Sequence, residues 1–310
     1  MANGERPPAD LPGQRVALPD DWALTHPQHD GSVWYRAGFD RPADTASDEL
    51  LGLYIERACS NVEVHLNGHR IFSGGRMSPP VTRNCHYAQL VTLPAALLKD
   101  SGNVLDLKLQ GSASQRVAAR QRAAGLSALA IGPYDAMSAA YADQVFWSAG
   151  SVKIVAVVLI ALGGLMIVLG LLNPREAHIG YFGWTCLGWA LLSARSWWRD
   201  VPLDNVNAEF LFSAMFAPIV ALAVQFLLSH AGVRSRMLES ALLAQCVVMP
   251  MSLLLAGPGR LFVMVAAWSV VLAAELFAGV VLQLRLLWRE RRHDFWPMAL
   301  LEGVAAAIVL

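Results

Sequence analysis

Two patterns of hydrophobic and polar positions divide the chain near residue 146. Short alternating stretches fill residues 15–146, and long apolar runs fill residues 147–310. Alternation with a period of two is typical of strands that bury one face, whereas about 20 consecutive apolar residues can cross a bilayer as a helix. The pattern therefore predicts an all-β N-terminal domain followed by an all-α transmembrane bundle.

The predicted β-domain consists of short strands separated by turn signals. Val62, Val64 and Leu66 alternate with polar residues, and Asn67-Gly68, a strong signal for a tight hairpin, follows them. The run 50–55 is almost entirely apolar, which indicates a strand covered on both faces. Regular short strands of this kind favour a β-sandwich or jelly roll. Further strands are expected at 33–39, 71–72, 105–109 and 126–131.

The apolar runs predict six membrane-spanning helices, the last of them incomplete. Glycines in the first two helices suit close helix packing, because a missing side chain lets two backbones approach. These glycines are Gly163, Gly164, Gly170, Gly180, Gly183 and Gly188. The six predicted spans are 152–172, 178–198, 209–229, 238–256, 260–288 and 295–310.

The loop charges predict the orientation of the helices. One alternating set of loops carries seven arginines and the other carries three, and the arginine-rich side of a membrane protein is normally cytoplasmic. The β-domain is therefore expected outside, in the periplasm or at the surface of a bacterium. The richer set is Arg175, Arg234, Arg236, Arg285, Arg289, Arg291 and Arg292, and the poorer set is Arg195, Arg199 and Arg260.

Both ends of the sequence suggest a piece of a longer protein. Residues 1–14 are expected to be a disordered or truncated N-terminus, because residues 1–15 hold no apolar core of a signal peptide. At the other end the chain is still apolar at Leu310. We therefore expect further sequence on both sides.

Several motifs resemble a known architecture. The stretches Leu18-Pro19-Asp20-Asp21-Trp22, Val33-Trp34-Tyr35-Arg36 with Phe39, Val64-His65-Leu66-Asn67-Gly68, and Leu93-Pro94 with Leu97-Leu98 and Asn103-Val104-Leu105 resemble the galactose-binding-like jelly roll of β-galactosidase-type glycoside hydrolases. A jelly roll followed directly by a helical bundle is similar to the bacterial seven-transmembrane receptors with diverse intracellular signalling modules. This resemblance covers nearly the whole chain.

The resemblance implies a function in signal transduction. It implies a sensor that binds an extracytoplasmic ligand, such as a carbohydrate, and transmits the binding signal to a cytoplasmic output. A histidine kinase with a cognate response regulator is the first expectation, and a diguanylate cyclase is the alternative. A homodimer is expected by analogy with sensor kinases. Two other functions are a transporter with an outer substrate-binding domain and a cell-surface carbohydrate-active enzyme. The enzyme would need a pair of acidic residues in a further domain, for which these residues leave no room.

Composition supports the membrane assignment and narrows the partners. The chain is 55% hydrophobic and only 15% charged, and its formal net charge is zero. No basic stripe points to nucleic acid, so the expected partners are the lipid bilayer and a small molecule. Cys59 and Cys85 lie in the β-domain, where an oxidising compartment would allow a disulfide, although two free thiols are the plainer interpretation.

The richest polar cluster of the β-domain is the segment 74–87. Planar donors beside an aromatic ring can hold a sugar or a carboxylate, whereas arginines in such a loop more often bond nearby carbonyl groups. The candidate ligand-binding residues are Arg76, Arg83, Asn84, His86 and Tyr87.

A second group of candidates lies in the helical half. Glu275 and Glu302 are acidic residues inside predicted spans, where an ionisable group is a functional candidate unless Gln225, Gln245 or a serine binds it. Another cluster is expected to anchor the interface or to dock the outer domain, and consists of Arg195, Trp197, Trp198 and Arg199.

No motif for catalysis, a cofactor or a metal is recognised in the chain. A glycine-rich phosphate loop, a paired-histidine helix and a Gly-x-Ser-x-Gly turn are all missing from the sequence. We therefore predict no enzymatic activity for these 310 residues, and no cofactor.

Overall fold

The computed structural model describes residues 13–42 and 49–309. The predicted N-terminal segment 1–14 and the end of the sixth span at Leu310 lie largely outside these residues. The chain divides into two compact units, one formed by the β-domain with the segments 193–210 and 258–262, and the other by the remaining helical residues.

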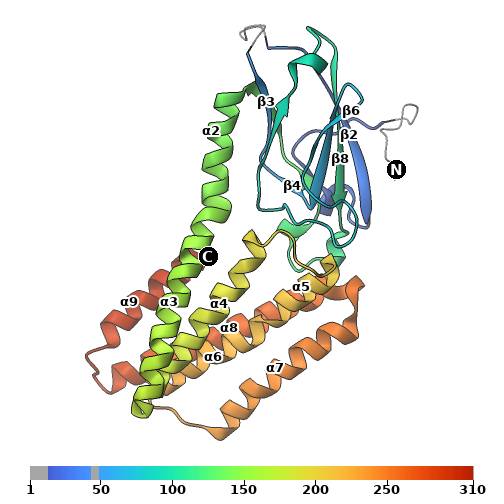
Figure 1. Ribbon diagram of the computed structural model, residues 1–310. Coiled ribbons are helices and arrows are strands. Elements are labelled where there is room, and N and C mark those ends of the chain that lie inside the picture. The colour runs from blue at the N-terminus through green and yellow to red at the C-terminus, as the bar shows by residue number, and fades with distance from the viewer. Residues whose placement is uncertain (1–12, 43–48, 310) are drawn as a thin grey trace. The chain divides into compact units, whose positions relative to one another are not determined.

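The fold-class prediction is confirmed, because an antiparallel β-domain precedes a helical region (Figure 1). The sheets have the orders β2-β8-β5-β6, β10-β3-β7 and β1-β9-β4. The strands are β1 Asp20–Asp21, β2 Gly31–Phe39, β3 Leu51–Ile55, β4 Ala58–Cys59, β5 Asn61–Leu66, β6 His69–Ser73, β7 Gln89–Leu93, β8 Asn103–Gly111, β9 Gly125–Leu126 and β10 Leu129–Pro133. A four-residue helix, α1 Trp22–Thr25, follows β1.

The core of the sandwich lies between the two larger sheets. Side chains at alternate positions of β5 and β8 are fully buried, among them Val64 and Leu107, which are paired across the two strands. Leu53 of β3 and Val91 of β7 contribute from the other sheet. The period-two alternation of the sequence therefore sets the buried face, as expected for antiparallel strands.

The Asn-Gly hairpin forms where it was predicted. Asn67 and Gly68, between β5 and β6, have φ values of 49° and 87°, which are the positive angles that this turn requires. The Asn67 side chain also ties the turn to a neighbouring loop: its Nδ2 donates to the Leu97 carbonyl at 2.7 Å, and its Oδ1 accepts from the Val104 amide at 2.9 Å. The hairpin is thus anchored by both backbone and side chain.

The N-terminal motif is joined to β2 by a buried polar chain. Trp22 Nε1 donates to the Tyr35 hydroxyl at 2.6 Å, and that hydroxyl donates to Asp20. Burial, with the Asp20 carboxylate beside it, raises the pKa of Tyr35. These contacts give Tyr35 a packing role, while Trp34 faces the other way and lies against the ring of His65.

The strand β3 is covered on both faces, as its continuous apolar run predicted. It lies between β10 and β7, and α2 Tyr134–Val145 packs against it. The approach at Gly52 is close, because a Cβ atom there would lie 3.3 Å from Met137 Cβ. Thus α2 begins directly after β10 and belongs to the β-domain side of the chain.

The first long helix begins well before the apolar run that marks it in the sequence. α2 continues through a π-helical segment, Phe146–Gly150, into α3 Ser151–Leu172 (Figure 1). The sequence placed the domain boundary at residue 146 because α2 carries polar residues such as Asp135 and Asp143 that interrupt its hydrophobicity.

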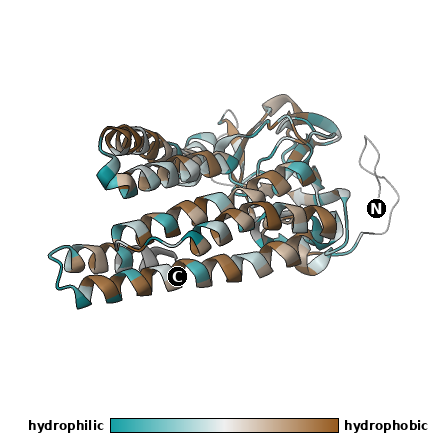
Figure 2. Ribbon diagram, turned by 90° about the horizontal axis from the view of Figure 1, so that it is seen from below, coloured by the Kyte–Doolittle hydropathy of each residue, from teal (hydrophilic) through white to brown (hydrophobic). Residues whose placement is uncertain are grey.

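The remaining helices alternate with short connections. Figure 2 shows that hydrophobic residues predominate along them. The remaining helices are α4 Ala177–Trp197, α5 Asn205–Ala214, α6 Phe216–His230, α7 Arg236–Ala256, α8 Leu261–Arg289 and α9 Phe295–Val309. Pro218 cannot donate a backbone hydrogen bond to residue 214, which accounts for the break between α5 and α6 where one span had been expected.

Among the described residues, four segments are long and apolar enough to cross a membrane. They are Tyr134–Leu172, Asn205–His230, Arg236–Ala256 and Pro258–Arg289. The other two predicted spans correspond to α4, whose sequence mixes apolar and polar residues, and to α9, which has 15 residues. The protein is thus a β-domain joined to a set of membrane-type helices.

Glycines bring α3 and α4 together, as the sequence indicated. A Cβ atom on Gly163 would lie 2.8 Å from the Gly183 carbonyl oxygen, and one on Gly170 would lie 2.7 Å from the Gly180 nitrogen. Only glycine permits backbones to approach this closely. Gly164, in contrast, faces open space.

Candidate functional site

A buried polar region of the first unit joins the 74–87 loop to the segment 193–210. This segment contains the end of α4, a connecting loop and the start of α5. Two hydrogen bonds tie it to the loop: the Arg83 amide donates to the Arg199 carbonyl at 3.0 Å, and the Tyr87 hydroxyl donates to the Trp197 carbonyl at 3.3 Å. The loop of the sandwich is therefore attached to the end of α4 and the connection that follows it.

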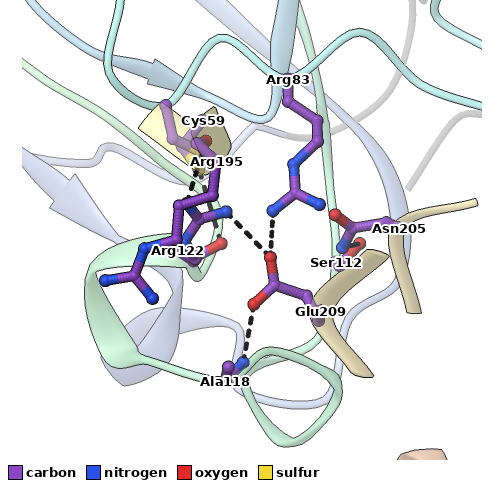
Figure 3. Close-up of polar contacts among 9 residues, drawn as sticks. Cys59, Arg83, Ser112, Ala118, Arg122, Arg195, Asn205 and Glu209 are labelled. Carbon is purple, nitrogen blue, oxygen red and sulfur yellow. Dashed lines mark hydrogen bonds and ion pairs between the residues drawn. A yellow bond between two sulfur atoms is a disulfide. The ribbon is translucent and has the colours of Figure 1, made fainter. Parts of the chain in front are cut away.

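A buried carboxylate lies at the centre of this region (Figure 3). Glu209 of α5 forms ion pairs with Arg83 and with Arg122, and its other oxygen accepts the Ala118 amide at 3.0 Å. The Glu209 side chain is 2% exposed, and those of Arg83 and Arg122 are 8% exposed. Charges removed from water to this extent require close partners, and Glu209 is shared between two guanidinium groups that come from different loops of the sandwich.

Arg122 extends the network to α4. Its Nη1 reaches Glu209 at 2.9 Å and its Nη2 donates to the Arg195 carbonyl at 3.2 Å. The single side chain of Arg122 thus contacts both helix ends of the 193–210 segment.

The loop is also held by a disulfide between Cys59 and Cys85. This bond corrects the interpretation of the two residues as free thiols. The bond joins the end of β4 to the 74–87 loop, 26 residues further along the chain. It therefore fixes the loop next to Arg83 and Asn84.

A second set of contacts centres on Asn84, which is completely buried. Its Nδ2 donates to Asn61 Oδ1 at 2.7 Å and to the Gly74 carbonyl at 2.8 Å, and its Oδ1 accepts Arg199 Nε at 2.7 Å. Arg199 Nη2 also donates to the Gly74 carbonyl at 3.0 Å, and the guanidinium lies 5.0 Å from the centre of the Tyr87 ring. Arg199 is therefore oriented by three neighbours, Asn84, Gly74 and Tyr87.

An open cleft of about 800 Å³ lies beside this network. Asp200 lies on one wall and accepts the Thr82 hydroxyl at 2.6 Å, while Arg76 Nη2 stands 3.5 Å from the same Asp200 oxygen. The lining residues are Ser73, Gly74, Gly75, Arg76, Thr82, Arg199, Asp200 and Pro202. All of them belong to the first unit.

His86 lies in the same loop, surrounded by cations. Burial is the main reason that its pKa is lowered to about 4, and the nearby Arg122, Arg195, Arg57 and Arg83 lower it further. The imidazole is consequently neutral at physiological pH. His86 therefore adds a neutral imidazole to a region rich in arginine.

The structure divides the five predicted ligand-binding residues into two groups. Arg76 lines the open cleft, whereas Arg83, Asn84 and Tyr87 take part in the contacts with the 193–210 segment, and His86 lies beside them. Of the predicted interface residues, Arg195 and Trp197 contribute backbone carbonyls and Arg199 its side chain, while Trp198 is partly exposed.

Three residues of this region were not found from the sequence. Glu209, Arg122 and Asp200 carry the principal ion pairs, but Glu209 is 126 positions from Arg83. One signal was present, because Glu209 is an acidic residue directly before a long apolar run. Its partners become evident only when the chain folds.

The acidic residues within the helices lie in the second unit. Glu275 lines a small cavity of about 190 Å³ between α6, α7 and α8, with Gln245 within hydrogen-bonding reach. Within residues 13–42 and 49–309, the Oε2 atom of Glu275 and both carboxylate oxygens of Glu302 are buried without a hydrogen-bond partner. Gln245 also donates weakly to the Ala217 carbonyl at 3.5 Å, and Gln225 is half-buried on α6.

A second polar cluster lies at the end of α6, also in the second unit. His230 is bonded through Nε2 to Asp294 at 3.2 Å and through Nδ1 to Gln283 at 3.1 Å. Arg292 joins the cluster, because it pairs with Asp294 and donates to the His230 carbonyl at 2.9 Å. The edge of the His178 ring faces His230 at 5.2 Å. This cluster connects α6 to the turn between α8 and α9.

The described residues contain no group of three histidine, cysteine, aspartate or glutamate side chains that could hold a metal ion. No protein-family model matches the chain, and a search of curated proteins finds no similar sequence.

Proposed function

We propose that this chain is the receptor part of a bacterial signal-transduction protein. In this proposal the β-sandwich binds a small extracytoplasmic ligand, such as a carbohydrate, and the helices relay binding to a cytoplasmic output. The observation that carries the proposal is the network in which the 74–87 loop, beside an open cleft, holds the ends of α4 and α5 through Arg83, Glu209 and Asn84.

A switch of this kind has one physical requirement. A ligand can shift an equilibrium only if it binds one arrangement more tightly than the other. A ligand in the cleft would contact Arg76 and Thr82 of the sandwich together with Arg199 and Asp200 of the helix-end segment. Any change in their spacing would therefore alter the ligand contacts and the ends of two helices together.

Two observations support an extracytoplasmic β-domain. The Cys59–Cys85 disulfide is typical of an oxidising compartment, and the loops expected on the other side of the membrane are richer in arginine. We accordingly propose a multi-pass protein of the bacterial inner membrane with a periplasmic β-domain. The proposed output is a histidine kinase acting on a response regulator, or otherwise a diguanylate cyclase, in a homodimeric receptor.

Hydrogen exchange can test the proposed relay. The full chain in nanodiscs is exposed to glucose, glucuronate or inorganic phosphate, and exchange is followed in peptides covering 74–87 and 193–210. A ligand that the receptor recognises slows exchange in the loop and changes it in the helix ends. In Glu209→Gln the loop response remains while the helix-end response is reduced, because the central carboxylate is lost.

Two results would reject the receptor proposal. One is a ligand that protects the loop without any change at 193–210 in the wild-type chain, since that would be binding without relay. The other is uptake of the bound compound into sealed proteoliposomes, which would make the protein a transporter. Asp30→Asn, which alters an exposed ion pair with Arg116, is the matched control and leaves both responses unchanged.

A further inference from the structure

The cleft beside the 74–87 loop contains Arg76, a cation whose ion pair is weak. Its ion pair with Asp200 is long, with 3.5 Å between Arg76 Nη2 and the Asp200 oxygen, and the two side chains are 50% and 64% exposed. Exposed pairs of this kind contribute roughly 0–1 kcal/mol, because water and salt screen them. The Arg76 guanidinium is therefore readily available to a stronger anionic partner.

The cleft contains a second guanidinium that is already oriented. Arg199 uses Nε and Nη2 to bind Asn84 and the Gly74 carbonyl, and the Tyr87 ring lies beneath it. These contacts fix the plane of the group before any ligand arrives. Guanidinium groups recognise carboxylate and phosphate oxygens through paired hydrogen bonds, and a pre-oriented group loses less entropy on binding.

The other lining groups favour an anion over a neutral sugar. Two arginines face one aspartate, and the remaining side chains are the hydroxyls of Ser73 and Thr82 and the ring of Pro202. No aromatic ring lines the cleft in the part of the chain that the structure describes, since Tyr87 lies behind Arg199. The lining thus offers positive charge and hydrogen bonds without a flat apolar surface on which a sugar ring could stack.

We propose that this cleft binds a small oxyanion, the carboxylate or phosphate group of a ligand, between Arg76 and Arg199. Asp200 is the internal anion that the ligand replaces at Arg76. This inference rests on the proposed receptor function and specifies its ligand class. When the ligand takes Arg76, Asp200 keeps only its bond from Thr82, and the segment leading into α5 loses one of its ties to the sandwich.

The same chemistry could come from a soluble ligand or from a lipid headgroup. The test therefore uses the full chain in nanodiscs of phosphatidylcholine and, separately, in nanodiscs that also contain phosphatidylglycerol. Inorganic phosphate, glucuronate and glucose are titrated at low salt, and affinity is read from the protection of the 74–87 loop against hydrogen exchange. A headgroup ligand protects the loop in the phosphatidylglycerol discs without any added compound.

Three variants make the test specific. Arg76→Ala lowers the affinity for phosphate or glucuronate by about tenfold or more, as expected for loss of a charge-assisted hydrogen bond. Asp200→Asn raises it by about two- to fivefold, because the internal competitor is removed. Arg70→Ala, at an exposed arginine paired with Glu63 on the same sandwich, leaves the affinity unchanged.

The opposite responses of Arg76→Ala and Asp200→Asn support the inference, whichever source supplies the anion. Unchanged anion binding in Arg76→Ala, or equal binding of glucose, overturns the assignment of an oxyanion site. Weaker anion binding in Asp200→Asn overturns the role of Asp200 as a competitor. Binding that follows these variants without any response at 193–210 leaves the site in place and rejects the relay instead.

Discussion

Replacing Glu209 by glutamine tests whether the buried ion-pair network holds the helix ends to the sandwich. The change removes the one carboxylate that Arg83 and Arg122 share, and all three side chains are at least nine-tenths buried. Breaking a buried pair by removing one partner destabilises a protein by about 3–5 kcal/mol, because the remaining charge stays out of water. Since two buried guanidinium groups each lose an ion pair here, we expect at least the lower figure.

The Ala118 amide provides a direct reporter of this effect. It donates to Glu209 Oε2 at 3.0 Å, so that it exchanges with solvent only when the network opens. A loss of about 3 kcal/mol accelerates its exchange on the order of 100-fold, at 1.4 kcal/mol for each factor of ten. The measurement is hydrogen exchange of the solubilised full chain, in a peptide covering 113–123.

A nearby exposed pair supplies the control for this prediction. Asp30 pairs with Arg116, two residues before Ala118, and both side chains are about two-fifths exposed. Asp30→Asn therefore changes the exchange rate by less than about fivefold. Adding Arg83→Gln to Glu209→Gln recovers part of the loss, because one uncompensated charge disappears. If Glu209→Gln accelerates exchange no more than Asp30→Asn does, the network is not what holds the segment.

Three further outcomes follow from the structure. The free energy of unfolding decreases by about 1–3 kcal/mol as pH falls from about 6.5 to about 4, because His86 binds a proton in this range in the unfolded chain but not in the folded one. In denaturant titrations at several pH values, His86→Gln removes this part of the pH dependence. Gly183→Leu destabilises the α3–α4 contact by about 1–3 kcal/mol in a thermal unfolding assay, since its Cβ would lie 2.7 Å from the Gly163 carbonyl oxygen, whereas Gly164→Leu has little effect. Asp294→Asn removes the ion pair with Arg292 and weakens the bond to His230, and is expected to accelerate exchange at the end of α6 by about tenfold; an unchanged rate would show that the cluster does not join α6 to the following turn.

The local pattern of the sequence was enough to predict most individual elements. Alternation at 62–66 and 105–109 identified two central strands, and Asn67-Gly68 identified the hairpin between β5 and β6. These features depend on neighbouring residues, since the period of side-chain direction and the need for positive φ are local properties. The glycines of α3 and α4 also indicated close packing, because a glycine within an apolar helix has few other purposes.

The sequence was less informative where an element is defined by its contacts with another part of the chain. The helix α2 packs on β3 with one face and carries polar residues on the others, so that no apolar run marked its beginning. The cysteines gave no framework spacing, and the disulfide between Cys59 and Cys85 depends on the end of β4 meeting the 74–87 loop in space. In both cases the deciding contact is with a residue far along the chain.

The division of the chain into a β-domain and membrane-type helices was determined by the sequence alone, because hydrophobic periodicity and run length are local quantities. The tertiary structure decided what the 74–87 loop does. It placed Arg76 in an open cleft and turned Arg83 and Asn84 towards the helix ends, where Glu209 and Arg199 meet them. The physical reason is that a buried charge is stable only beside its partner, and here the partner lies more than 100 residues away.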